Sequence, residues 1–88
     1  MNFLKFPLKS LDAGSVVEVS LSGVESDVFL VDPANLRAME SGKRFSYHGG
    51  HFNRSLVRLS VPSAGRWTAV VVPGSGGRVN ASVTVNEK

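Results

Sequence analysis

Two histidines flank a Gly-Gly step near the middle of the chain, in the tetrapeptide His-Gly-Gly-His at residues 48–51. Two imidazoles on a flexible turn can share a Zn²⁺ or Ni²⁺ ion, but a closed zinc site takes four protein ligands and an open catalytic site takes three. The spacing supplies no third ligand, and Asp27, Asp32 or Glu40 would have to reach the pair through the fold. The sequence therefore predicts no metal site and no cofactor, and the alternative is a Gly-Gly turn with incidental histidines.

Serine, histidine and aspartate are all present, but no serine is marked as a nucleophile. There is no G-x-S-x-G elbow, and Ser75 lies in a glycine-rich loop with no strand-to-helix turn after it. That loop, residues 74–78, offers backbone N–H groups and an arginine to an anion, yet it precedes a strand and lacks the spacing of a phosphate loop. The absence of cysteine excludes a nucleophilic thiol and a disulfide framework. An 88-residue chain also leaves little room for a water-excluded cleft. We predict that the protein is not an enzyme, and a small hydrolase or metal-binding domain is the third hypothesis.

A binding surface is the favoured chemistry, and its candidate residues surround the same Gly-Gly step: Arg44, Tyr47, His48, His51, Arg54 and Arg58. Aromatic rings interleaved with arginines suit single-stranded nucleic acid or an acidic peptide. The alternative places Phe45, Tyr47 and Phe52 in the core or on strand faces and the arginines on an ordinary solvated face. Arginines of this stretch paired to Glu18 or Glu25 would argue against a basic patch.

Charge is divided unevenly along the chain. Residues 1–40 carry three basic and six acidic side chains, whereas residues 41–88 carry seven basic and one acidic, for a formal total of +3. If the halves form separate faces, the positive face can meet phosphate or an acidic partner; if their strands interleave, the charges pair. The first hypothesis is a non-enzymatic protein-interaction or sensing module, and the second is a nucleic-acid or other polyanion-binding domain. The sequence specifies neither the partner nor the oligomeric state, and unpaired strand edges permit β-mediated dimerisation.

Short strands would position these residues. Alternating apolar and polar residues predict strands at 3–8, 15–22, 27–32, 44–47, 56–61, 67–72 and 78–85. A bulge or tight turn is predicted at 48–51, because both glycines can take positive φ. Asp32 as N-cap, Pro33 at the first helical position and Gly42 past the end predict one short helix near residues 33–41. Trp67 is predicted to anchor the core. We expect one all-β domain spanning residues 1–88, an antiparallel sandwich or flattened barrel of about seven strands.

The first 14 residues do not have the composition of a signal peptide, because Pro7 and two lysines interrupt their apolar positions. No stretch approaches the roughly 20 apolar residues that span a bilayer. We expect a soluble cytoplasmic protein with no membrane partner.

Four segments also carry a family resemblance: GSVVEVSLSG (14–23), DVFLVDPANL (27–36), YHGG (47–50) and SVPSAGRW (60–67). In this order, and followed by a strand of alternating valines, they resemble a small bacterial family known as domain of unknown function eighteen eighty-three. The resemblance covers essentially the whole chain. It implies a compact β-sandwich-like domain, standing alone or attached to signalling domains of the Toll/interleukin-receptor type. It implies no activity and transfers no catalytic residue.

Overall fold

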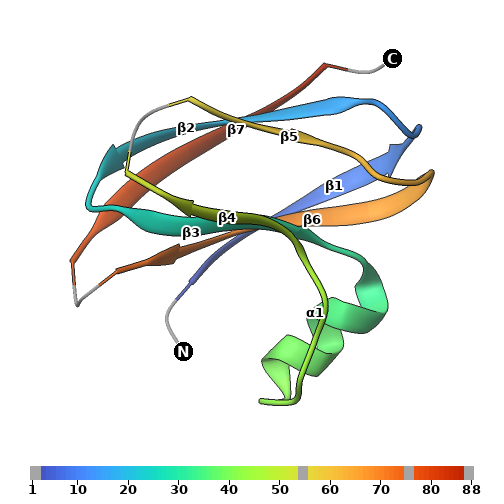
Figure 1. Ribbon diagram of the computed structural model, residues 1–88, viewed down its shortest axis with the longest axis horizontal. Coiled ribbons are helices and arrows are strands. Elements are labelled where there is room, and N and C mark those ends of the chain that lie inside the picture. The colour runs from blue at the N-terminus through green and yellow to red at the C-terminus, as the bar shows by residue number, and fades with distance from the viewer. Residues whose placement is uncertain (1–2, 54–55, 75–76, 87–88) are drawn as a thin grey trace.

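The computed structural model describes residues 3–53, 56–74 and 77–86 (Figure 1). These residues form seven strands and one helix: β1 (Leu4–Leu11), β2 (Val16–Gly23), β3 (Ser26–Val31), α1 (Pro33–Glu40), β4 (His48–Phe52), β5 (Val57–Ser60), β6 (Gly65–Pro73) and β7 (Val79–Asn86). The predicted all-β class, with about seven strands and one short helix near residues 33–41, is confirmed.

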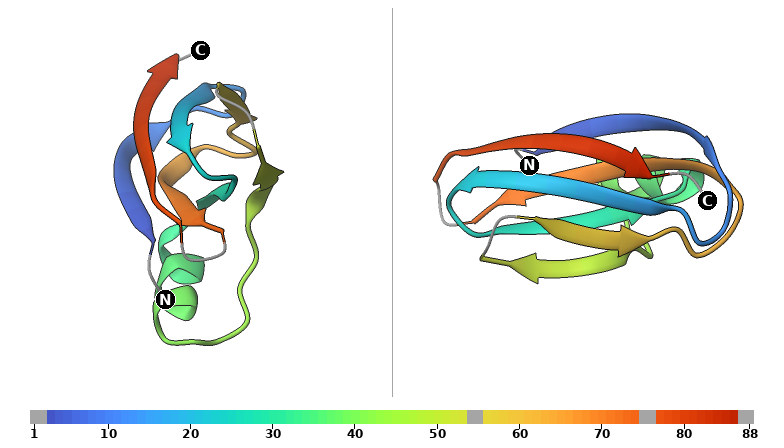
Figure 2. Two further views of the ribbon diagram at one scale, coloured as in Figure 1. Left: turned by 90° about the vertical axis from the view of Figure 1, so that its left-hand side faces the viewer. Right: turned by 90° about the horizontal axis from the view of Figure 1, so that it is seen from above.

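The strands form two antiparallel sheets, one of four strands in the order β1-β6-β3-β4 and one of three in the order β5-β2-β7, and they do not close into a barrel. The view along the strands shows the sheets stacked, with α1 outside the four-stranded sheet (Figure 2, left). Inward-facing residues of both sheets make the main core, whose buried members are Leu11, Val17, Val19, Val28, Leu30, Val57, Leu59, Val61, Trp67, Ala69 and Val71. Period-two alternation selects these positions, because successive strand residues point to opposite faces.

A second apolar cluster lies on the outer face of the four-stranded sheet. Phe29 and Val31 of β3 and Val70 of β6 pack there against Met39 of α1. The helix begins as predicted: the Asp32 carboxylate, as N-cap, accepts a hydrogen bond from the Asn35 backbone N–H at 2.8 Å. Because α1 covers this face, β3 is apolar on both of its sides.

The structure corrects the prediction for residues 44–51. The expected strand at 44–47 is wrong, since these residues have no regular secondary structure. The expected bulge or tight turn at 48–51 is also wrong, since these residues belong to β4 and pair with β3 in an unbroken register. Gly49 pairs with Phe29 at φ 157°, and a Cβ at residue 49 would overlap the Val28 carbonyl oxygen and lie 2.6 Å from the Phe29 Cα. The glycine therefore permits a close approach between two strands and not a reversal of the chain.

The acidic and basic halves of the chain interleave. Each sheet contains strands from both halves, and an ion pair joins the halves: Arg58 Nε lies 2.9 Å from Glu18 Oε2. The charge asymmetry of the sequence therefore does not divide the molecule into one negative and one positive face. The described residues form no helix that is long and apolar enough to cross a bilayer.

Candidate functional site

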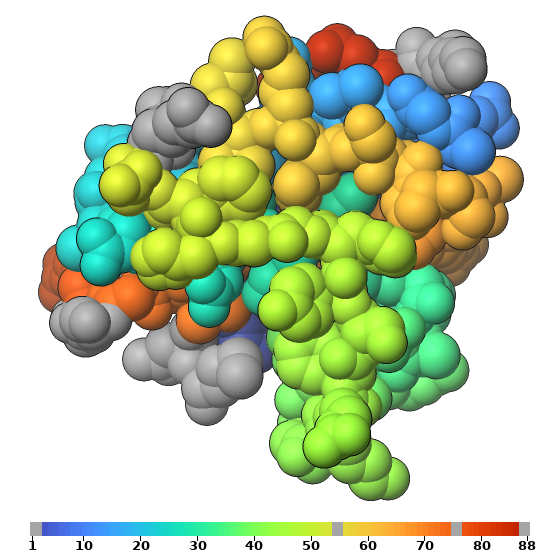
Figure 3. All heavy atoms as spheres, in the orientation of Figure 1, coloured from blue at the N-terminus to red at the C-terminus, as the bar shows by residue number. Residues whose placement is uncertain are grey.

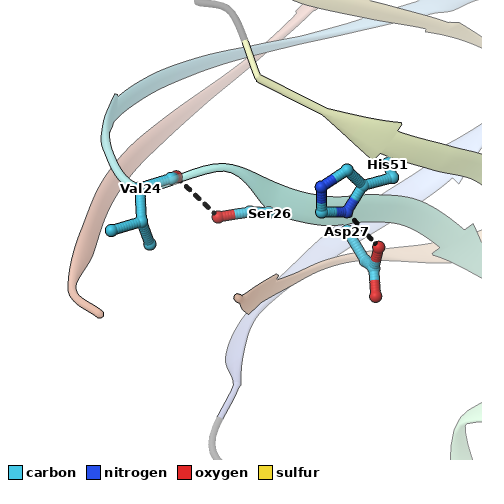
Figure 4. Close-up of polar contacts among 4 residues, drawn as sticks. All are labelled: Val24, Ser26, Asp27 and His51. Carbon is cyan, nitrogen blue, oxygen red and sulfur yellow. Dashed lines mark hydrogen bonds and ion pairs between the residues drawn. The ribbon is translucent and has the colours of Figure 1, made fainter. Parts of the chain in front are cut away.

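The two histidines of residues 48–51 lie on opposite faces of β4. Residues three apart in a strand point to opposite sides of the sheet, so His48 and His51 cannot share a metal ion in this conformation. The His48 ring lies edge-on to the core Trp67 ring, with centroids 5.6 Å apart. The His51 imidazole instead donates from Nδ1 to Asp27 Oδ1 of β3 at 2.8 Å (Figure 4). Asp27 thus reaches His51 through the fold, as the sequence allowed, but as a partner to one imidazole.

The Asp27–His51 pair forms one side of a pocket of about 270 Å³ on the outer face of the four-stranded sheet. We name it the aromatic pocket, and its lining residues are Asp27, Phe29, Phe45, Tyr47, Gly50, His51 and Val72. Segment 43–52, which contributes four of them, runs as a continuous band across the visible face of the molecule (Figure 3, yellow-green). Of the six predicted binding residues, the structure brings Tyr47 and His51 together in this pocket.

Three rings make the apolar wall of the aromatic pocket. The Phe29 centroid lies 5.9 Å from that of Phe45 and 5.0 Å from that of Tyr47, and the last two are 5.8 Å apart. At these separations the rings contact each other, so no ligand fits between them. Phe29 is buried, whereas Tyr47 is 52% exposed, so a bound group would meet the exposed ring of Tyr47.

Helix α1 holds this wall in place through a side chain that the sequence analysis did not single out. The Asn35 side-chain carbonyl accepts a hydrogen bond from the backbone N–H of Ser46 at 2.8 Å, between the two ring-bearing residues of segment 43–47. The Asn35 amide in turn donates to the N-cap Asp32 at 2.9 Å. An asparagine in a first helical turn is common as a local capping partner, so its sequence position gave no signal of a contact eleven residues away.

The predicted arginines do not meet at this pocket. Arg58 points outward from the three-stranded sheet and pairs with Glu18, the arrangement that argues against a basic patch. Arg44 is exposed and precedes Phe45, which packs on the outer face of the four-stranded sheet. Arg44 and Arg58 thus belong to segments on different sheets, and a shared binding surface that contains both stays a prediction. Arg54 lies outside the described residues.

Comparison with known proteins identifies a family for this chain. A family model described as "Domain of unknown function (DUF1883)" matches residues 1–88, the whole chain. The chain belongs to the DUF1883 family. No curated protein and no solved structure matches it. Because the DUF1883 description assigns no activity, the function has to be argued from the site.

The two histidines of this DUF1883 domain contact different groups among the described residues. The hydrogen bond of His51 goes to a carboxylate, and the contact of His48 is with an indole ring, so among the described residues neither imidazole is bonded to a hydroxyl. Activation of a serine nucleophile needs that bond. Within residues 3–53, 56–74 and 77–86, no group of three or more metal-ligating side chains is present. Ser75, which the sequence did not mark as a nucleophile, lies outside these ranges.

Proposed function

We propose that the domain is a non-enzymatic protein-interaction module whose partner inserts one side chain into the aromatic pocket. The observation that carries this proposal is the exposed ring of Tyr47 beside the Asp27 carboxylate in a pocket of about 270 Å³. Pockets that bind drug-sized molecules usually measure roughly 300–1,000 Å³. The smaller volume suits a single side chain of a partner.

The walls favour arginine as that side chain. A guanidinium is planar, stacks on aromatic faces and donates hydrogen bonds to carboxylates, so it satisfies both walls at once. Asp27 Oδ1 accepts from His51, and among the described residues Oδ2 is left as an acceptor for the ligand. A lysine ammonium would make the charge interaction without stacking, and leucine would make neither contact.

The competing hypotheses have less support. A polyanion-binding surface needs clustered cations, and Arg58 is paired with Glu18. A hydrolase needs a hydroxyl bonded to His48 or His51, and no such bond is present in the part of the chain that the structure describes. A cytoplasmic location remains part of the proposal, on the composition of residues 1–14 alone, and fractionation of the source cells checks it.

The test is an amide chemical-shift titration of the isotope-labelled domain with N-acetylarginine amide, and separately with the lysine and leucine analogues. We expect the arginine analogue to shift the amides of Gly50, His51 and Val72 and to bind at least fivefold more tightly than the leucine analogue. Tyr47→Ala should lose this preference. Leu56→Ala, which removes the other exposed large apolar side chain at 43% exposure and lies outside the pocket, should keep it. Equal affinity for arginine and leucine, or an unchanged Tyr47→Ala variant, would contradict the proposal.

A further inference from the structure

The four edge strands of the two sheets differ in how they discourage pairing with another chain. β1 contains Pro7, which lacks an N–H, exposed Lys5, and an irregular register between Pro7 and Ser10. β4 has only five residues, two of them glycine, and β5 has four residues with Arg58 pointing outward. Short length, proline, lysine and irregular register are the usual protections of an edge strand. Three of the four edges therefore carry such a protection.

β7 carries none of them. It has eight residues without proline, glycine or charge, and all eight pair with β2 in an unbroken register. In the part of the chain that the structure describes, β2 is its one neighbour. The Val24 N–H donates to the Arg78 carbonyl at 3.1 Å, which marks residues 24 and 78 as a hydrogen-bonded pair. Since such pairs alternate along an antiparallel ladder, the backbone groups of Val79, Ala81, Val83 and Val85 point away from β2.

An incompletely covered apolar row lies beside this edge. The inward-facing residues of β1, Leu4, Phe6 and Leu8, are only half-buried, as are the inward-facing residues of β7. By contrast, the inward-facing residues of β3 and β5 are buried. β7 packs over β6, and β1 is the next strand outward on the same side of the molecule (Figure 2, left). The three-stranded sheet is thus one strand too narrow to cover β1.

We propose that the β7 edge binds an extended segment of a partner chain as an eighth strand. Backbone N–H and C=O groups at the edge recognise an extended backbone, and the half-buried β1 row recognises apolar side chains at alternate positions of that segment. A second copy of this chain fits less well. If the β7 strands of two copies paired, the β1 strand of each copy would be brought against the β1 strand of the other. The outward side chains of β7 are Asn80, Ser82, Thr84 and Asn86, so the contact has no charge preference. This edge is independent of the aromatic pocket.

The test uses a short synthetic peptide in which valine and threonine alternate, with lysine at each end for solubility. We expect its addition to shift the amides of Val79, Ala81, Val83 and Val85 and to slow their hydrogen exchange at least tenfold, with little change on raising salt. Ala81→Pro removes an edge-directed N–H that has no partner within the ladder, so this variant should fold and bind at least fivefold more weakly. Ser82→Ala, on the same strand, should bind as the unchanged protein does.

Three results would overturn the proposal. The first is the absence of shifts at β7 at millimolar peptide. The second is equal binding of a peptide methylated on alternate backbone nitrogens, which cannot extend a sheet and which tests the idea without any protein variant. The third is a concentration-dependent dimer in sedimentation whose interface protects the same four amides, because the occupant would then be a second copy. Retained peptide binding by Tyr47→Ala supports the independence of the two surfaces.

Discussion

A glycine-to-alanine pair in β4 tests how the pocket is built. Gly49→Ala would place its Cβ 2.6 Å from the Phe29 Cα, about 0.8 Å closer than the 3.4 Å at which ordinary contact begins, and against the Val28 carbonyl as well. The obstructing atoms belong to backbone, so no side-chain rotation relieves the overlap. The φ of 157° also lies where alanine is strained. Gly50→Ala is the matched control, because its Cβ would meet nothing nearer than the Phe52 ring at 4.0 Å.

The expected cost follows from what must move. β4 has to separate from β3 and give up part of their five-pair ladder, in which each hydrogen bond contributes about 0.5–1.5 kcal/mol. With the backbone strain added, Gly49→Ala should lose about 2–4 kcal/mol of unfolding free energy. That is a large share of the about 4–13 kcal/mol expected of a domain of this size. Gly50→Ala should change the unfolding free energy by no more than about 1 kcal/mol in either direction.

Urea denaturation followed by the fluorescence of Trp67 measures both variants, since this is the single tryptophan and it is buried. At a slope of about 1 kcal/mol per molar urea, the Gly49→Ala midpoint should fall by about 2 M or more. A Gly49→Ala midpoint equal to that of the unchanged protein would refute the close strand approach. A Gly50→Ala midpoint lowered as far would show that any side chain in this step is harmful, which the geometry does not predict.

Three further predictions concern the supports of the fold. Asp32→Ala removes the N-cap and should lower the unfolding free energy, measured in urea, by about 1 kcal/mol. Asn35→Ala should speed hydrogen exchange in segment 43–47 and cost less stability than Asp32→Ala; unchanged exchange would argue against the Asn35–Ser46 hydrogen bond as a support of that segment. A double-mutant cycle on Glu18 and Arg58 should give a coupling of about 0.2–1 kcal/mol that weakens in salt, since the arginine side chain is 65% exposed, and a larger coupling would contradict this surface assignment. Trp67→Phe loses a 2.9 Å hydrogen bond to a backbone carbonyl and part of the core volume, and should cost about 1–3 kcal/mol by thermal circular dichroism; a neutral result would refute its role as core anchor.

Much of the fold could be predicted because strands with one buried face alternate apolar and polar residues in the sequence. Residues 15–22 and 78–85 alternate cleanly, and they became β2 and β7 within one residue at each end. The helix was equally predictable, because an N-cap, a proline and a terminal glycine act locally. Even the inward direction of Trp67 followed from alternation, and it is 6% exposed.

The prediction failed where the physical cause was a long-range contact. A Gly-Gly step has the same local meaning in a turn as in a strand that must approach its neighbour closely, and only the pairing of Gly49 with Phe29 distinguishes them. The Asp27–His51 contact could not be predicted for the same reason. The two residues are 24 apart in sequence, and the register of β3 with β4 places them side by side. The arginines were grouped by sequence proximity, but the chain crosses from one sheet to the other between β4 and β5 and carries Arg58 to the far side.

The Gly-Gly step that first suggested a metal site has a second consequence for the pocket. A Cβ at position 49 would overlap the Val28 carbonyl oxygen and lie 2.6 Å from the Cα of Phe29, the residue whose ring contacts Phe45 and Tyr47. Because glycine lets β4 pair closely with β3 at Phe29, segment 43–47, which leads into β4 and is held by Asn35, lies over the Phe29 ring without forming a strand. The aromatic pocket therefore depends on the absence of a side chain as much as on the rings. If this is correct, Gly49→Ala should weaken arginine binding more than its loss of stability accounts for, and Gly50→Ala should not.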